Sequence, residues 1–509
     1  AYVASDVCAD KADEHGRHGR VAESRSEAAA FSGRWYYSGF QAEQLCVHLS
    51  NMEGGRQFSV EYDYLTQVFS EQQIEVLHQC LTRILDEALN DPEKPLAEVG
   101  ILPRTLRDQV LYAFNQTETP LPPVDLYEKF SAAARAHPTR SALIFAGSRT
   151  DYQTLERQAA QVAAALENAL DGQKREKESP LAAVLLPRTP QLYAAMLGAM
   201  RAGVPYLLLS CDLPAGRIRQ ILSQSGAQAV LSTPQILARL GGDPAPIACM
   251  ENLPESQAPA RAVPPDALAY VVYTSGSTGV PKGVEISRWS LLNLSQAMQA
   301  VYGAGAVLSV CNVGFDAFVL ESAAAMLDGR TVVLPREEEE ESPQKLADLI
   351  RSFGVGFLSL TPSRLSAFLQ QPDFAWAVSG LRSIICGGEA FPADLLHRLQ
   401  QLTTADIYNQ YGPSETTVAV SIKRLNGCAA ITAGKPMENC RLYVLDRWMQ
   451  PLPVGVYGDL YVGGICVGRG YRGAPQLTEQ SFFASPFEAG ERIYRTGDLA
   501  CWTQEGELL

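Results

Sequence analysis

From about residue 126 onward, helical stretches alternate along the chain with short apolar segments at residues 181–186, 206–209 and 229–232. A repeated order of strand, helix and strand is typical of a sheet that is covered by helices. The chain has 509 residues, of which 46% are hydrophobic, so it is long enough for several lobes with large cores. The sequence therefore predicts an α/β fold for the large central part.

The two ends of the chain have other patterns. After about residue 431, glycine-punctuated strands at residues 441–445 and 459–462 predict a small distorted β-barrel lobe. Near the N-terminus, residues 58–64 alternate like a strand. The segment that follows, residues 70–89, places its apolar side chains on one helical face: Ile74, Leu77, Leu81, Ile84, Leu85 and Leu89.

Composition limits the class of protein. A formal net charge of −14 argues against nucleic acid as a partner, because phosphate backbones are bound by basic surfaces. No apolar stretch approaches the length of a membrane span, and the N-terminus has no signal-peptide pattern. Eleven cysteines without CxxC pairs are expected to be ordinary thiols of a reducing cytoplasm. The acidic run at residues 336–341 is expected to be a solvated loop or helix start without function.

The segment at residues 274–283 reads TSGSTGVPKG and directly follows the apolar run at residues 267–273. Glycines allow backbone N–H groups to turn inward around an anion, the hydroxyl side chains add donors, and Lys282 adds a positive charge. The pattern predicts a phosphate-binding loop, although Gly/Ser/Thr clusters are also typical of solvated turns. A Walker A loop does not fit, because Lys282 is followed by glycine and residues 284–287 read as a second strand.

Further segments join this loop in a resemblance to a known family. Together they resemble the motifs of the adenylate-forming enzymes, and in particular the adenylation domains of nonribosomal peptide synthetases. The segments are, in chain order, residues 151–166, residues 198–212, the phosphate loop, NQYGPSETT at residues 409–417, GDLYVGGICVGRGYRGAPQLTEQSF at residues 458–482 and YRTGDL at residues 494–499. The ordered motifs extend over roughly residues 115–509.

The resemblance implies a domain organisation. Residues 1–30 are expected to be a disordered or irregular lead-in, and residues 31–102 resemble the α+β C-terminal part of a condensation domain. Residues 103–124 are a linker, residues 125–430 the large adenylation subdomain, and residues 431–509 its β-barrel lobe. The signature HHxxxDG is absent, so no condensation chemistry is expected. The family's hinge GRxDxQxKxRG and its later lysine, which belong to a small C-terminal subdomain, are also absent, so such a chain is expected to bind ATP and amino acid but to adenylate poorly.

Forming an acyl adenylate requires a carboxylate oxygen to attack the α-phosphate of ATP while pyrophosphate leaves. The site must therefore neutralise the triphosphate and align two anions. By resemblance, Thr274, Lys282 and Glu415 are the catalytic residues, and Glu415 also holds Mg²⁺. The full set of residues that the resemblance assigns to ATP is Thr274, Ser275, Gly276, Ser277, Thr278, Gly279, Lys282, Gly388, Asn409, Tyr411, Gly412, Ser414, Glu415 and Asp498.

Three of these residues are expected to hold the nucleoside. Tyr411 offers an aromatic face for adenine, and Asn409 offers polar groups for the purine edge. Asp498 has two acceptors suited to the ribose hydroxyls. Simple core packing is the alternative role for Tyr411.

Asp316 is expected to separate amino acids from other acids. A carboxylate in an apolar segment is costly unless a cation meets it, and the α-ammonium of an amino acid would do so. The alternative is a helix N-cap. The positions that match the family's substrate pocket are Asp316, Ala317, Leu320, Ser359, Ile385, Gly387, Gln410, Val418 and Ala419. The small residues Ala317, Gly387 and Ala419 leave room for a bulky group, and Ser359 and Gln410 could bond a polar one. They favour a large amino acid with a polar tip, aromatic ones included.

The resemblance thus implies a cytoplasmic nonribosomal peptide synthetase fragment that uses ATP and Mg²⁺ to activate an amino acid. Its expected partners are the phosphopantetheine of a peptidyl carrier protein domain and the condensation domain of the same chain, with an MbtH-like protein as a further candidate. Neither nucleic acid nor membrane is expected. Two alternatives remain, namely an acyl-CoA or aryl-acid ligase of the same superfamily and a non-catalytic scaffold module.

Overall fold

The structure, a computed structural model, describes residues 7–8, 20–21, 44–50, 59–171, 180–241, 247–275 and 281–509. The chain forms two compact units. The N-terminal unit comprises Ala1–Val110 and Asp446–Val456, and the large unit comprises Leu111–Leu445 and Tyr457–Leu509. Most of the predicted lead-in lies outside the described residues, which there include only the paired strands β1 (Val7–Cys8) and β2 (Arg20–Val21).

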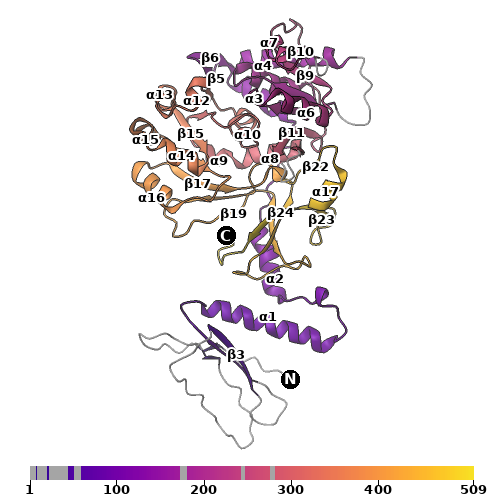
Figure 1. Cartoon of the computed structure of the whole chain (residues 1–509), viewed down its shortest axis with the longest axis vertical. Coiled ribbons are helices and arrows are strands. Elements are labelled where there is room, and N and C mark those ends of the chain that lie inside the picture. Colours follow the sequence, from indigo (N-terminus) through magenta and orange to yellow (C-terminus); the bar gives the residue numbers. More distant parts are fainter. Residues whose placement is uncertain are drawn as a thin grey trace, which may run out of the picture. The chain divides into compact units, whose positions relative to one another are not determined.

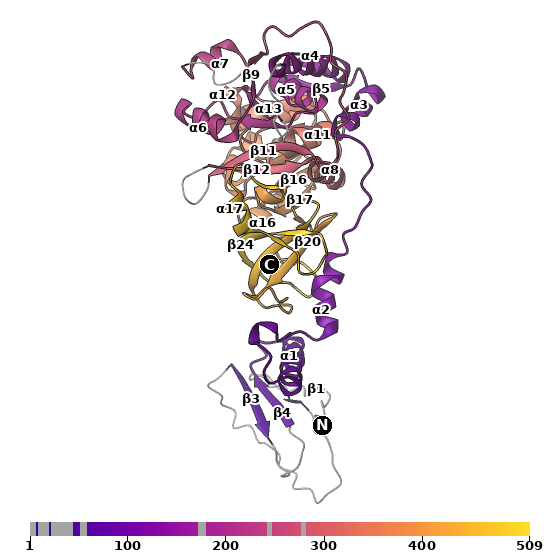
Figure 2. The same ribbon diagram turned by 90° about the vertical axis from the view of Figure 1, so that its right-hand side faces the viewer.

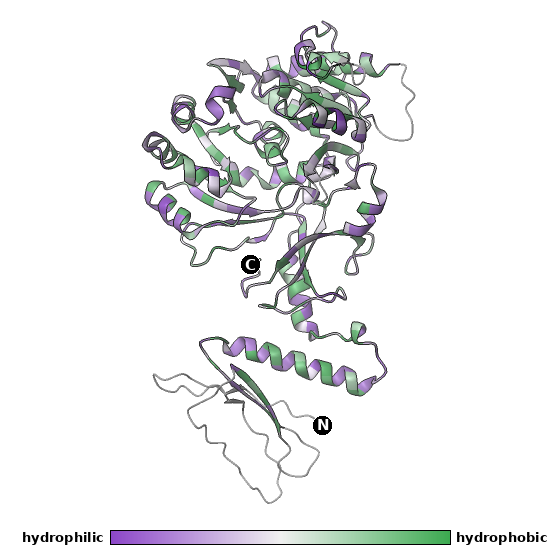
Figure 3. Ribbon diagram, in the orientation of Figure 1, coloured by the Kyte–Doolittle hydropathy of each residue, from purple (hydrophilic) through white to green (hydrophobic). Residues whose placement is uncertain are grey.

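The N-terminal unit pairs two antiparallel strands, β3 (Leu45–Ser50) and β4 (Ser59–Tyr64), beside the helix α1 (Glu71–Asn90). Hydrophilic and hydrophobic residues alternate along α1 (Figure 3). A capping box starts this helix, because the Ser70 hydroxyl accepts from the backbone of Gln73 and the Gln73 side chain accepts from the backbone of Ser70.

The apolar face predicted for α1 is only partly buried. Ile74 packs in a core with Tyr62 and Tyr64, and Leu77 and Leu81 border it. Towards the C-terminal end of the helix, however, Leu85 and Leu89 are 46% and 58% exposed. The unit continues with η1 (Leu96–Glu98) and α2 (Arg104–Leu111).

A first sheet of the large unit has seven strands in the order β10-β9-β7-β8-β11-β12-β22. The five strands from β10 to β11 are parallel, and β12 and β22 add to them antiparallel. Figure 2 shows β11 and β12 side by side. The strands are β7 (Ala182–Leu185), β8 (Tyr206–Leu209), β9 (Ala229–Ser232), β10 (Ile247–Cys249), β11 (Leu268–Ser275), β12 (Pro281–Ser287) and β22 (Gly470–Tyr471).

A second sheet has nine strands in the order β19-β18-β17-β16-β15-β13-β14-β5-β6. Its six central strands, β17 to β5, are parallel, while β6, β18 and β19 are antiparallel edges. The α/β prediction is confirmed. The strands are β5 (Ser141–Phe145), β6 (Ser148–Asp151), β13 (Ala306–Leu308), β14 (Val332–Leu334), β15 (Val355–Leu360), β16 (Ser383–Cys386), β17 (Asp406–Tyr411), β18 (Ser421–Arg424) and β19 (Lys435–Pro436).

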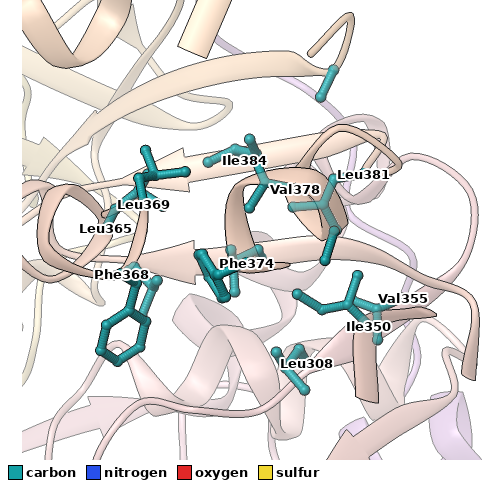
Figure 4. Packing of buried hydrophobic residues seen from close by; sticks show 14 of the residues in the cluster. Leu308, Ile350, Val355, Leu365, Phe368, Leu369, Phe374, Val378, Leu381 and Ile384 are labelled. Carbon is teal, nitrogen blue, oxygen red and sulfur yellow. The ribbon is translucent and has the colours of Figure 1, made fainter. Parts of the chain in front are cut away.

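Helices cover these sheets (Figure 1). In one core, Leu365 and Phe368 of α14 and Phe374 of α15 pack with Ile384 of β16 (Figure 4). Each such side chain contributes about 1.5–3 kcal/mol when fully buried. The helices of the large unit are η2 (Ala113–Asn115), α3 (Leu126–Ala136), α4 (Tyr152–Leu170), α5 (Pro190–Arg201), α6 (Ala215–Ser225), α7 (Pro234–Ala238), α8 (Arg288–Ala297), α9 (Gln299–Tyr302), α10 (Phe318–Glu321), α11 (Ala323–Leu327), α12 (Glu337–Glu340), α13 (Pro343–Phe353), α14 (Pro362–Phe368), α15 (Pro372–Val378), α16 (Ala393–Leu402), η3 (Ser414–Thr416) and α17 (Pro475–Ser481).

The predicted β-barrel lobe is an open antiparallel sheet. Its strands are β20 (Cys440–Leu445), β21 (Gly458–Gly464), β24 (Arg492–Ala500) and β23 (Phe482–Ala484), in that order. Within the described residues no pairing joins β23 to β20, so the sheet does not close. The sequence predicted two of these strands, β20 and β21, but the arrangement of the sheet depends on pairing between distant segments.

The acidic run, predicted to be a solvated loop or helix start, forms the helix α12, but two of its carboxylates are not free in solvent. Glu339 is 8% exposed and accepts a hydrogen bond from Arg336 at 2.7 Å. Glu340 pairs with the buried guanidinium of Arg188, at 3.0 and 3.2 Å. The run therefore forms α12 and compensates a buried cation. In the part of the chain that the structure describes, no helix is long and apolar enough to cross a bilayer.

Candidate active site

Several of the predicted site residues lie at or just after the carboxyl ends of strands in both large sheets. The phosphate loop follows β11, Asp316 follows β13, Gly387 follows β16, and Glu415 follows β17. Loops at the carboxyl ends of parallel strands are the usual ligand sites of α/β folds. The strand order, rather than the sequence order, brings these loops to one region.

The phosphate loop joins two antiparallel strands, as predicted. Thr274 of β11 lies opposite Lys282 of β12 in the register. The tip of the loop, with Gly276, Ser277, Thr278 and Gly279, lies outside the described residues, as does the side chain of Ser275. The roles assigned to these five residues therefore remain predictions. Thr274 and Lys282 are held at the base of the loop by the hairpin.

Glu415 lies close to the phosphate-loop lysine. The phenol of Tyr471 donates a hydrogen bond of 2.7 Å to Glu415 Oε1. The ammonium of Lys282 lies 5.3 Å from the centre of the same Tyr471 ring. A single tyrosine thus contacts both the predicted phosphate ligand and the predicted metal ligand.

The donor set around Glu415 fits Mg²⁺ that is bound mainly through a nucleotide. Among the described residues, no group of three or more His, Cys, Asp or Glu side chains gathers to hold a metal ion. Mg²⁺ usually keeps several waters and binds through one or two carboxylates plus substrate phosphates. One carboxylate beside a phosphate loop is therefore a suitable donor.

The residues predicted for the nucleoside meet in the structure. The phenol of Tyr411 donates a 2.5 Å hydrogen bond to Oδ2 of Asp498, which is 87 residues further along the chain and exposed. Tyr411 is half-buried, so core packing does not account for its position. Burial and the negative charge of Asp498 raise the pKa of this phenol. Gly388, at φ +78°, has open space where a side chain would lie.

Asn409 is engaged within the protein. It is 9% exposed, and its Nδ2 donates to the carbonyl oxygen of Thr432 at 2.8 Å. Gly412 is required by close packing, because a Cβ there would lie 2.7 Å from the Cα of Ala419. Both residues therefore contribute to the nucleoside region through contacts within the protein.

Asp316 faces the loop that carries Glu415. The Ser414 hydroxyl donates a 2.5 Å hydrogen bond to Asp316 Oδ2. Burial raises the pKa of the Asp316 carboxyl above its ordinary value of 3.8, the bond from Ser414 lowers it, and the charge of Glu415 raises it. The alternative role as an N-cap is wrong, because the N-cap of α10 is Ala317. Ser414, which was assigned to ATP, thus contacts the predicted substrate anchor.

The predicted pocket positions are mostly enclosed. Leu320 and Ile385 are fully buried, and Ser359, Val418 and Ala419 are nearly so. The interpretation of Gly387 as free space for a substrate is wrong, since a Cβ there would lie 2.5 Å from Cγ of Gln410. The Gln410 side chain already fills that volume. Its buried Oε1 has no hydrogen-bond partner among the described residues.

The backbone is strained next to Glu415. Thr417 and Val418 have φ angles of 64° and 70°, which β-branched residues rarely adopt. Hydrogen bonds hold this conformation, including one of 2.7 Å from Thr417 Oγ1 to the carbonyl oxygen of Cys466. Such strain costs about 1–3 kcal/mol per residue and clusters at functional sites. The strained turn directly follows the short helix η3, which carries Ser414 and Glu415.

Sequence reasoning assigned no role to Tyr471, although this residue lies in a segment that carries the resemblance. Only the strand pairing reveals its position, because Val284 of the phosphate-loop strand β12 lies opposite Tyr471 of β22. Spacing along the sequence contains no signal for this pairing.

A separate cavity of about 550 Å³ lies elsewhere in the large unit. Its lining includes Arg188, Cys211, Asp212 and Glu340, but none of the residues predicted for ATP or substrate. The candidate site is therefore defined by converging side chains and not by this cavity.

Comparison with known proteins agrees with this geometry. A sequence profile of the family described as AMP-binding enzyme matches residues 130–472, which is more than half of the chain. The chain belongs to the AMP-binding enzyme family. The predicted resemblance to nonribosomal peptide synthetases is also confirmed, since the relatives found are proteins of this class.

Among these relatives, the dimodular nonribosomal peptide synthase of Bacillus subtilis (strain 168) is 32% identical over 486 residues, which cover 92% of this chain and 20% of that protein. A crystal structure of the nonribosomal peptide synthetase FmoA3 has a TM-score of 0.80 at 26% identity, covering 91% of this chain and 51% of that one. The four-domain synthetase holo-AB3403, bound to AMP and glycine, has a TM-score of 0.79 at 26% identity and covers 93% and 35%. The chain thus spans only a fraction of the length of its relatives.

Proposed function

We propose that this chain is the nucleotide-binding and amino-acid-binding part of a nonribosomal peptide synthetase module. The whole protein would convert an amino acid and MgATP to aminoacyl-AMP and pyrophosphate, and then load a phosphopantetheine thiol. The observation that carries the proposal is the adjacent pair Ser414 and Glu415. One contacts the carboxylate of Asp316, and the other lies beside Lys282 through Tyr471.

This arrangement suits a reaction in which the carboxylate of an amino acid must approach the triphosphate of ATP. Asp316 would bind the α-ammonium of the amino acid, which directs the α-carboxylate of the substrate towards the Ser414–Glu415 loop. Lys282 and the N–H groups of the phosphate loop would bind the β- and γ-phosphates. Bound Mg²⁺ would neutralise part of the triphosphate charge. The chain's own residues thus fix the attacking carboxylate and the α-phosphorus in one place.

The nucleoside would bind between Tyr411 and Asp498. The Tyr411 ring offers a face for adenine, and the exposed Asp498 carboxylate can accept from both ribose hydroxyls. In the free protein, the Tyr411 phenol holds this carboxylate at 2.5 Å. Tyr411 would therefore orient Asp498 before the nucleotide arrives.

The side chain of the amino acid is expected to carry a hydrogen-bond donor. Gln410 Oε1 is a buried acceptor without a partner among the described residues, and such a group costs about 1–3 kcal/mol. A donor on the substrate would remove that cost and give selectivity. This favours the polar tip of the predicted amino acid, whereas Gln410 occupies the volume that Gly387 was expected to leave for a large one. If small aliphatic amino acids bind more tightly in a calorimetric panel, this assignment is wrong.

The function itself is tested by titrating the 509-residue chain with MgATP and then with amino acids. We expect heat from MgATP, and tighter binding of amino acids than of matched acids that lack the α-amino group. Equal binding of both would favour the acyl-CoA or aryl-acid ligase. Absence of heat from MgATP would favour the scaffold module.

The remaining elements of the proposal concern the whole protein. They are the peptidyl carrier protein domain, the condensation domain to which residues 31–102 would belong, an MbtH-like partner and a cytoplasmic location. The similarity to multidomain synthetases supports the two domain partners. Co-purification of the chain with a carrier domain of its own synthetase would test the first of them.

A further inference from the structure

Tyr471 is a buried side chain to which the proposed function assigns no role of its own. It is 6% exposed and lies on β22. Its hydroxyl donates to Glu415 Oε1 at 2.7 Å, and its ring lies 5.3 Å from the Lys282 ammonium. Three segments that are far apart in the sequence therefore meet at one phenol.

The position of Tyr471 is firmly fixed by the fold. β22 pairs with β12, so Tyr471 lies opposite Val284, two residues after Lys282. The backbone N–H of Tyr471 donates to Thr478 Oγ1 at 2.9 Å. The ring packs edge-on against Phe482 with 5.5 Å between centroids. A side chain held on several sides can orient its neighbours rather than follow them.

Tyr471 lies between two side chains of opposite charge, Lys282 and Glu415. Opposite charges close to each other attract, and a direct ion pair would compete with the binding of phosphates by the lysine and of a metal ion by the glutamate. Both side chains belong to the described residues, and no ion pair joins them. Instead, the ammonium faces the aromatic ring and the carboxylate accepts from the phenol.

We propose that Tyr471 is a positioning residue that keeps Lys282 and Glu415 apart and oriented for a metal–nucleotide complex. The hydroxyl orients the carboxylate towards the metal ion, and the ring orients the ammonium towards the phosphates. This inference rests on the proposed function, because it requires the site to bind MgATP. The inference adds to the proposed function that the hydroxyl and the ring of Tyr471 have separate roles.

The two parts of the side chain can be separated by substitution. Tyr471→Phe removes the hydroxyl and keeps the ring, whereas Tyr471→Leu removes both. Each variant is titrated calorimetrically with ATP in the presence of Mg²⁺ and with ATP in the presence of a chelator. Tyr152→Phe is the control, because it removes another buried phenol, which donates to the carbonyl oxygen of Arg330 at 2.7 Å.

We expect Tyr471→Phe to weaken MgATP binding about tenfold, since a hydrogen bond to a charged group contributes that much, and to leave metal-free ATP binding within about twofold. Tyr471→Leu should weaken both. In a Glu415→Gln background, the effect of Tyr471→Phe on MgATP should disappear. Tyr152→Phe should match the wild-type chain in both titrations.

The inference is overturned if Tyr471→Phe binds MgATP like the wild-type chain. It is also overturned if this variant weakens ATP binding equally with and without metal, which would indicate a merely structural role. Thermal unfolding of each variant shows whether it is folded. If folded Tyr471→Leu, which also lacks the hydroxyl, binds MgATP like the wild-type chain, the inference is likewise overturned. If the wild-type chain itself gives no heat with MgATP, the proposed function fails instead.

Discussion

The hydrogen bond between Ser414 and Asp316 leads to a prediction about pH. Ser414→Ala removes the 2.5 Å bond that the hydroxyl donates to the buried carboxylate. A hydrogen bond to a charged group contributes about 1.5–3 kcal/mol, so its loss makes the ionised form of the carboxyl less favourable. The pKa of Asp316, which burial already raises, should therefore rise further, because the bond from Ser414 lowers it.

The sign of the effect follows from the charge that binds the substrate. Only the ionised form of Asp316 attracts an α-ammonium, and a carboxyl group loses its charge as the pH falls through its pKa. In Ser414→Ala this loss should begin at a higher pH than in the wild-type chain. Amino-acid affinity at the acidic end should therefore fall about tenfold, which corresponds to the loss of a hydrogen bond of about 1.5 kcal/mol to a charged group.

The assay is a calorimetric titration of amino acid at a series of pH values, with MgATP titrations in parallel. Ser414→Thr keeps a hydroxyl and should restore the wild-type amino-acid affinity at acidic pH. The control is Ser363→Ala, because the Ser363 hydroxyl donates to the exposed carboxylate of Glu389. If Ser414→Ala keeps the wild-type amino-acid affinity at acidic pH but binds MgATP more weakly, the reasoning is refuted. Ser414 would then act on the nucleotide, as the resemblance first implied.

Three further predictions concern stability. Gly387→Ala places a Cβ 2.5 Å from Cγ of Gln410 and should lower the free energy of unfolding by about 1–3 kcal/mol, measured by denaturant titration; unchanged stability would show that Gln410 moves freely. Val418→Gly should lower it by about 1 kcal/mol or more, because loss of the buried side chain and the greater freedom of glycine in the unfolded chain outweigh the strain relieved at a φ of 70°, and a gain would contradict this. Burial raises the pKa of Glu321 to about 7 from 4.5. The folded state thus keeps a proton that the unfolded state has released, and stability should fall by up to about 3 kcal/mol as the pH rises through this window. Glu321→Gln should remove this part of the pH dependence of Tm, and parallel curves for both chains would exclude it.

The sequence alone determined the chemistry of individual segments. The phosphate loop was predicted from glycines, hydroxyls and Lys282 between two apolar runs, and the structure confirms the two strands that flank it. Asp316, Glu415 and Asp498 were selected because their places in the motifs resemble those of the family's functional carboxylates. Local pattern suffices for such statements because strand periodicity and residue chemistry act over a few neighbouring residues.

Only the tertiary structure decided which groups meet. Asp316 and Ser414 are 98 residues apart, and Glu415 and Tyr471 are 56 residues apart, yet each pair forms a hydrogen bond. The volume at Gly387 is filled by Gln410, and the predicted barrel is an open sheet. These features depend on strand order and register across the chain. Local sequence periodicity does not encode them, because they are fixed only when whole sheets pack together.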